Sequence, residues 1–152
     1  MKRSSVGGLL LLVASVVFLD TVFFAAITPL LPHYTHEFAL SKSEAGILSA
    51  SYAIGGLIAA LPGGWFVARF GAKPGMLLGL ATMTVSSLVF AFGGSIEVLD
   101  GARFVQGLGS SFSWAGGLAW LVTKGPAARR GELIGSAMAA ALVGVLLGPV
   151  LG

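Results

Sequence analysis

The sequence predicts an all-α integral membrane protein. Its 152 residues are 56% hydrophobic and only 10% charged, whereas a soluble domain carries about 25% charged residues. Five apolar segments each have roughly the 20 residues with which a helix crosses a hydrocarbon core about 30 Å thick. Strands are excluded because the segments do not alternate between polar and apolar residues, and lipid otherwise permits only helices. The chain has no cysteine, which excludes disulfides and thiolate metal sites.

The first predicted span follows Lys2 and Arg3, and this arrangement also occurs in secretory signal peptides. Its apolar run continues to Leu31 and four further spans follow, so we expect the segment to be retained as a helix. The five spans are expected at residues 6–31, 45–68, 75–96, 101–122 and 133–152.

Basic residues are concentrated in alternate connections between these spans, which predicts the orientation. The other two connections contain Lys42 as their only Lys or Arg, beside four acidic residues. The positive-inside rule therefore predicts a cytoplasmic N-terminus and places residue 152 on the outer side. The seven cations on the cytoplasmic side are Lys2, Arg3, Arg69, Lys73, Lys124, Arg129 and Arg130.

Small residues recur at every fourth position on two spans. Glycine lets membrane helices approach closely, so both stripes predict helix–helix contact faces, and ordinary packing explains either stripe taken alone. Pro149 removes a backbone hydrogen bond inside its helix and predicts a kink. The stripes are Gly56, Ala60 and Gly64 on the second span and Gly144, Gly148 and Gly152 on the fifth.

Asp20 and Arg103 are the only charged side chains inside the predicted spans. A charge at bilayer depth costs at least about 2.5–3.5 kcal/mol, so it normally faces the protein interior or a water-filled path. A carboxyl group shielded from water suits proton binding and release. Alternatively, Asp20 is a fixed counter-ion of Arg103, although Arg103 lies nearer the outer face and a direct pair would need its full side chain or a water. The sequence leaves both possibilities open.

The fourth span carries its polar and small residues on one helical face. We expect this face to meet other helices or an aqueous cavity, the alternative being a purely structural hydrogen-bonding seam. Its members are Arg103, Gln106, Gly107, Ser110, Ser113 and Gly117.

Several other activities have no support in the sequence. The chain has no phosphate-binding loop of the Gly-x-x-x-x-Gly-Lys-Ser/Thr type, and its glycine-rich run at 107–112 lacks the last glycine of a dinucleotide fingerprint. His33 and His36 are interpreted as solvated residues of the first outer loop. We therefore expect no cofactor, no metal, no enzymatic activity and no nucleic-acid partner.

Four motifs, taken in order along the chain, resemble the N-terminal part of a major facilitator superfamily transporter, and most of all its drug:proton antiporter branch. The first-helix signature runs from Leu19-Asp20 to Pro32, and the cytoplasmic loop motif from Gly64 to Lys73. The fourth-helix motif runs from Leu99 to Ser111, and the fifth-helix motif that marks exporters from Gly144 to Gly152.

The resemblance implies five helices of a six-helix half, in a transporter of 12 or 14 helices. It implies proton-coupled efflux of small hydrophobic or drug-like molecules across the cell membrane (the inner membrane in a bacterium), by alternating access. Asp20 would bind the proton, Arg103 would tune it, Gln106 would line the path and Gly107 would allow close helix approach. Gly144, Gly148, Pro149 and Gly152 would form a close contact that limits leak, and Gly64, Arg69, Gly71 and Lys73 the cytoplasmic turn.

Two features depart from this family pattern. Ala68 stands where an acidic residue of the cytoplasmic charge network is usual, and Ala72 replaces a basic residue. The sequence ends at Gly152 inside a motif, so we expect a longer reading frame whose C-terminal half is a partner of this one. The alternatives are a proton-coupled importer of a sugar or metabolite and a non-transporting truncated membrane protein.

Overall fold

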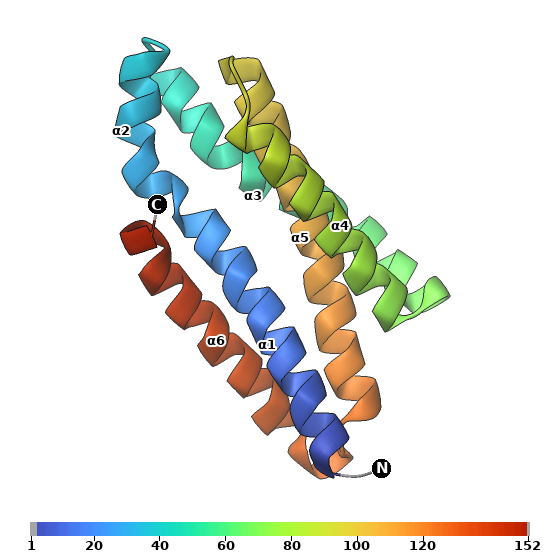
Figure 1. Ribbon diagram of the computed structural model, residues 1–152. Helices are drawn as coiled ribbons and strands as arrows, with labels where there is room; N and C mark the ends of the chain where they lie inside the picture. Colours follow the sequence, from blue (N-terminus) through green and yellow to red (C-terminus); the bar gives the residue numbers. More distant parts are fainter. Residues whose placement is uncertain (1–2, 152) are drawn as a thin grey trace.

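The computed structural model describes residues 3–151, and nearly all of them are helical (Figure 1). Lys2 and Gly152 lie outside the described residues. The elements are α1 (Arg3–Ala25), α2 (Ile27–Glu37), α3 (Lys42–Phe70), α4 (Ala72–Ala91), α5 (Ile96–Lys124), the short 3-10 helix η1 (Ala127–Arg129) and α6 (Arg130–Leu151).

Four helical segments of the described chain are long and apolar enough to cross a membrane: Val6–Glu37, Lys42–Phe70, Ala72–Ala91 and Ala127–Leu151. Their outer faces carry large apolar side chains, such as Leu61 at 86% exposure, which suit contact with lipid. The predicted span at 101–122 lies in α5, which has the length of α3 but is not among the segments apolar enough to span. Because α5 packs against α1, α3 and α4, its polar face meets protein.

The helix boundaries follow local sequence signals. Ser41 caps α3 in a capping box, in which its hydroxyl accepts from the Glu44 backbone and Glu44 accepts from the Ser41 backbone. Gly71 separates α3 from α4 with a φ of +101°, a conformation that favours glycine. Pro29 cannot donate to the carbonyl of Ala25, which accounts for the break between α1 and α2 at Ala26.

Two predictions about where helices end are wrong. The third span ends at Ala91 and not at Ile96, because Gly93 and Gly94 interrupt the helix and Ser95 caps the next one. His33 and His36 lie in helix α2 and not in a loop, since that helix continues through Pro32 to Glu37. The His33 imidazole lies 3.2 Å from the Glu37 carboxylate, one turn along the same exposed surface.

Close helix packing joins α5 to α3 and α4, and α1 to α6 (Figure 1). On α3 the contact face lies one residue earlier than predicted, because that register also carries Tyr52 inward onto α5. A methyl group at Gly64 would meet nothing within 4 Å, whereas one at Gly55 would collide with the backbone of Phe104. The buried small residues are Gly55, Ala59 and Gly63. Of the predicted stripe, Gly56 borders the contact, where its carbonyl accepts from Ser111 of α5, and Ala60 and Gly64 are exposed.

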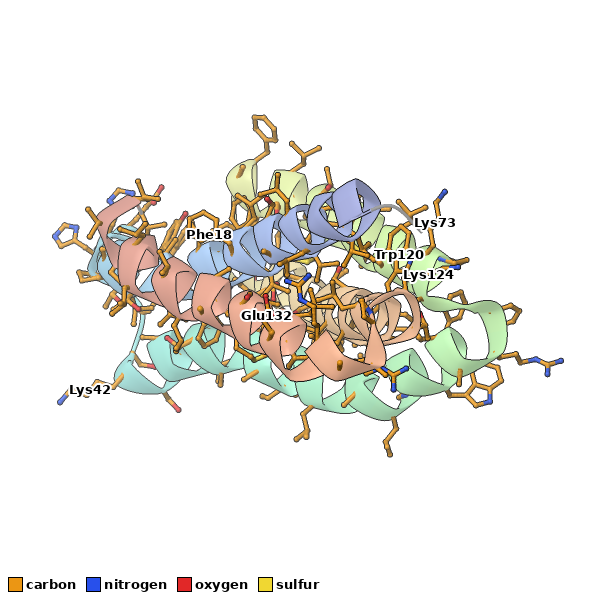
Figure 2. All side chains as sticks on the ribbon, turned by 90° about the horizontal axis from the view of Figure 1, so that it is seen from below. Phe18, Lys42, Lys73, Trp120, Lys124 and Glu132 are labelled. Carbon is orange, nitrogen blue, oxygen red and sulfur yellow. The ribbon has the colours of Figure 1, made fainter. Side chains whose placement is uncertain are left out.

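Basic side chains gather at one end of the bundle. Figure 2 shows Lys73 and Lys124 at the opposite end from Lys42. The start of α1 and the connection between α5 and α6 share the end that carries Lys124, while α2 lies at the other end (Figure 1). This arrangement agrees with the charge pattern from which the orientation was predicted.

Two apolar clusters enclose a polar layer. One cluster is centred on Val13, Val17, Met76, Leu121, Ala137 and Ala141 towards the basic end, and the other on Ile27, Leu48 and Leu99 towards the opposite end. Ser110 lies about 11 residues, or roughly 16 Å along α5, from both Leu99 and Leu121. The polar groups around it therefore sit near the middle of the bundle's length.

Candidate functional site: a buried polar layer between α1, α3 and α5

The Asp20 carboxylate, from the C-terminal third of α1, accepts hydrogen bonds from two neighbouring helices. Tyr52 of α3 donates its hydroxyl to Oδ1 at 2.5 Å. On α5, Ser110 donates to Oδ2 at 2.9 Å and the Trp114 indole donates to the same oxygen at 2.5 Å. Asp20 is only 2% exposed, so these three donors replace water around a carboxylate inside the bundle.

Arg103 lies beside Asp20 in the same layer but forms no direct ion pair with it in the described structure. Tyr52 stands between them. The Arg103 guanidinium carbon lies 4.9 Å from the centre of the Tyr52 ring, within the range of a cation–π interaction. Asp20 is thus not a directly bonded counter-ion of Arg103, and the contact between them passes through an aromatic side chain.

Arg103 also donates hydrogen bonds to backbone carbonyls at the end of α1. Its Nη1 donates to the Phe23 carbonyl at 3.1 Å and its Nη2 to the Phe24 carbonyl at 3.3 Å. Both carbonyls belong to the last turn of α1, where backbone acceptors lack partners within the helix and a cation is favoured by the helix dipole. Nε of Arg103 is buried and has no partner among the described residues.

Gln106 extends the polar layer to α4. Its side-chain oxygen accepts from Nη1 of Arg103 at 3.3 Å, and its amide nitrogen donates to Ser87 at 3.0 Å. Two cavities adjoin these residues, the first between α2, α4 and α5 and the second between α1 and α4. One, of about 310 Å³, is lined in part by Arg103, Gln106 and Ser87, and another, of about 270 Å³, by Asp20, Phe23, Met83 and Thr84.

Three of the predicted glycines lie where helix backbones meet. A methyl group at Gly107 would collide with the Tyr52 backbone, one at Gly144 with Thr21, and one at Gly148 would lie 2.6 Å from the Ala25 side chain. Gly152, the last residue of that motif, lies outside the described residues. α6 remains helical through Pro149 to Leu151, so the predicted kink there stays a prediction.

The residues of the predicted cytoplasmic loop motif lie away from the polar layer. Gly71 forms the turn between α3 and α4, and Arg69 and Lys73 flank it with exposed side chains. Gly64 lies in α3, on the wall of an open groove of about 760 Å³ that also contains Gly71 and Lys73. The residues of this motif therefore form a separate site at the basic end of the bundle, apart from the polar layer.

The polar roles of Tyr52 and Trp114 were missed from the sequence. Neither residue was predicted to belong to the site, since aromatic side chains fill membrane helices without needing a polar partner. A usable signal existed. Trp114 follows Ser110 by four residues on the polar face of α5, and a buried tyrosine hydroxyl or indole N–H needs an acceptor. No three His, Cys, Asp or Glu side chains of residues 3–151 come together as a candidate metal site.

Comparison with known proteins gives the family. The model of the Major Facilitator Superfamily matches residues 13–152. The chain belongs to the major facilitator superfamily. Multidrug resistance protein 2 of Bacillus subtilis (strain 168) is 28% identical over 142 residues, which cover 90% of this chain and 36% of that protein. The MFS-type transporter ppzB of Metarhizium rileyi (strain RCEF 4871) is 30% identical over 155 residues, covering 99% of this chain and 32% of that protein.

This major facilitator chain spans about a third of the length of the curated relatives it matches. The matched region includes the whole polar layer, from Asp20 on α1 to Trp114 on α5. The family assignment and the four membrane-length helices together make this a multi-pass membrane protein.

Proposed function

We propose that the protein carrying this chain is a secondary active transporter that exports small hydrophobic or drug-like molecules in exchange for protons. The observation that carries the proposal is a single carboxylate, Asp20, buried near the middle of the bundle and held by three donors from two other helices. Alternating access around a midplane site, between this half and a C-terminal half, would carry the substrate across the cell membrane.

Protonation of Asp20 would change how the helices are held together. The ionised carboxylate accepts all three hydrogen bonds, whereas the protonated acid carries a hydrogen of its own that needs an acceptor. The Trp114 indole can only donate, so a hydroxyl group of Tyr52 or Ser110 has to change from donor to acceptor. A bound proton therefore alters contacts among α1, α3 and α5 at once, which is how it would bias the alternation between states.

The substrate class is proposed from the surroundings of Asp20 and from one relative's name. The cavity beside Asp20 is lined by apolar side chains including Leu19, Phe23 and Leu80, which suit a hydrophobic molecule. The relative from Bacillus subtilis is named a multidrug resistance protein. Arg103 would tune the proton site and Gln106 would line the pathway between the two cavities.

The glycine motifs would serve the transport cycle at the edges of this layer. Gly107 lets α3 approach α5 closely enough for Tyr52 to reach Asp20. Gly144 and Gly148 would seal α6 against α1 and limit leak, together with Pro149. Gly71, with Arg69 and Lys73 beside it, would form a cytoplasmic turn whose cations contact lipid head groups.

The test is proton-driven efflux by the full-length protein in proteoliposomes, with the substitution Asp20→Asn. Asparagine keeps the shape of the side chain but cannot bind and release a proton, so we expect pH-driven efflux to be lost while substrate binding remains. Asp100→Asn, near the start of α5 and about ten residues before Ser110, is the matched control and should transport normally. Efflux by Asp20→Asn with the same pH dependence as the unmodified protein would refute the assignment, and uptake driven by the same gradient would favour an importer.

A further inference from the structure

We infer that Tyr52 is the positioning residue of the proton site, because it holds Oδ1 of Asp20 with its hydroxyl while its ring carries Arg103. This inference rests on the proposed role of Asp20 in binding a proton. Tyr52 makes both contacts from one rigid side chain, so the carboxylate and the guanidinium are coupled through the same ring.

The position of Tyr52 is fixed from three sides. The side chain is only 7% exposed, and its ring packs against Phe24 of α1 with centroids 5.2 Å apart. Arg103 covers the ring at 4.9 Å. Behind it, Gly107 brings the backbone of α5 directly against the Tyr52 carbonyl. A ring confined in this way has few alternatives to the observed contact with Asp20.

The capacity of each donor to accept a hydrogen bond in turn distinguishes Tyr52 from the other two donors. Oδ2 of Asp20 receives both Ser110 and the donor-only Trp114, so a proton on Oδ2 would face an N–H group that cannot accept. Among residues 3–151, Oδ1 receives only Tyr52, whose hydroxyl oxygen can accept once its own hydrogen turns away. A hydronium ion supplies the proton and leaves as water, the new O–H bond forms at Oδ1, and Tyr52 keeps its own hydrogen throughout.

Few charged groups compete with this contact. Arg103 is the charged residue that faces Asp20 from α5, and the tyrosine itself is the titratable group that faces it from α3. The charged residues of the other packed segments lie near helix ends: Lys42, Glu44 and Arg69 on α3, Lys73 on α4, and Arg130 and Glu132 on α6.

The first test measures the protonation of Asp20 without transport. In the full-length protein in liposomes, the infrared C=O stretch of a protonated carboxyl group is followed against pH, and the band lost in Asp20→Asn is assigned to Asp20. Tyr52→Phe keeps the ring and removes one donor to the ionised carboxylate. We expect its titration midpoint to move to higher pH by at least about one unit, a tenfold change in proton affinity. The pH profile of efflux should move in the same direction.

Tyr34→Phe is the matched control, since Tyr34 and Tyr52 are the two tyrosines of the chain and Tyr34 packs against Phe38 and Phe90 in the outer cluster. Its midpoint should equal that of the unmodified protein. A Tyr52→Phe midpoint equal to the control would overturn the positioning role while leaving the proton site intact. A protein without any carboxyl band assignable to Asp20 would instead refute the proposed proton site, and the inference with it.

The second test addresses the contact with Arg103. Arg103→Lys is introduced into the unmodified protein, into Tyr52→Phe and into Tyr52→Leu, and the shift of the Asp20 midpoint is compared in the three backgrounds. The shift should be similar where the ring is present and several-fold smaller in Tyr52→Leu, because the ring carries the contact. Equal shifts in all three backgrounds would show that Arg103 acts on Asp20 independently of Tyr52.

Discussion

Replacing Gly107 by alanine should force α3 and α5 apart at the level of Tyr52. The added methyl group would lie 2.8 Å from the Gly56 nitrogen and 2.9 Å from the Tyr52 carbonyl carbon, and closer still to the Tyr52 oxygen. All three are backbone atoms, which cannot rotate away as the end of a side chain can.

The size of the effect follows from these distances. Ordinary contacts of such a methyl group begin near 3.4 Å, so the backbones have to separate by at least about 0.6 Å at Gly56, and by more at Tyr52. Overpacking of this kind typically costs about 1–3 kcal/mol. Alanine in a helix interior regains about 1 kcal/mol over glycine, which offsets part of that cost.

A matched control separates the two contributions. Gly101 lies on the same helix and a methyl group there meets nothing within 4 Å, so Gly101→Ala shows the helix-propensity gain alone. We expect Gly107→Ala to be less stable than Gly101→Ala by about 1–3 kcal/mol in reversible unfolding of the purified protein. It should also raise the midpoint of the Asp20 titration, because the displaced Tyr52 hydroxyl loses its short contact with Oδ1. Equal stability of the two variants would refute the close approach of α3 and α5.

Two further predictions concern the ends of the helices. Ser41→Ala should speed hydrogen exchange in the first turn of α3 about fivefold, the effect of losing a typical N-cap, while Ser43→Ala should not. Hydrogen bonds from Ser41 hold the pKa of Glu44 below its ordinary value. The stability that they add is present above that ordinary value and is lost as the pH falls through the lowered pKa. Because the Ser41 backbone N–H donates to the Glu44 carboxylate, Glu44→Ala should weaken the first turn of α3 at neutral pH, and an effect as large in acid would contradict this. In this cysteine-free chain, Lys73→Cys should react with an impermeant thiol reagent only after the cytoplasmic side is opened, and Lys42→Cys should react in intact cells; the reverse pattern would invert the predicted orientation.

Composition and segment length were sufficient to predict the all-helical fold, because each span has to satisfy its own backbone in lipid. The inward-facing residues of α5 could also be predicted, since the polar residues of a membrane helix are more stable in contact with other helices than with lipid. The register of α3 could not. Gly55 and Gly56 start two equally good four-residue stripes, and only the contact of Gly55 with the Phe104 and Leu108 backbone across the interface selects the first.

The relation between Asp20 and Arg103 was beyond sequence reasoning for a different reason. The position of each residue along its own predicted span gave their difference in depth in the membrane, which already argued against a short direct pair. It could not reveal that Tyr52, from a third helix, occupies the space between them. Contacts among three helices depend on how the helices pack, and a periodic pattern describes only one helix at a time.

The least apolar of the long helices lies at the centre of the bundle, and this placement makes the polar layer possible. A membrane helix can carry Arg103, Gln106 and Ser110 only if other helices supply partners for them. Here α1 and α4 supply hydrogen-bond partners, and α3 supplies the Tyr52 ring beneath Arg103. One consequence concerns movement. Arg103 holds the last carbonyls of α1 immediately before the break at Ala26, and the same guanidinium lies on the ring whose hydroxyl holds Asp20. A change in the protonation of Asp20 therefore has a route of direct contacts to the break between α1 and α2, and we expect the angle of that break to respond to the proton.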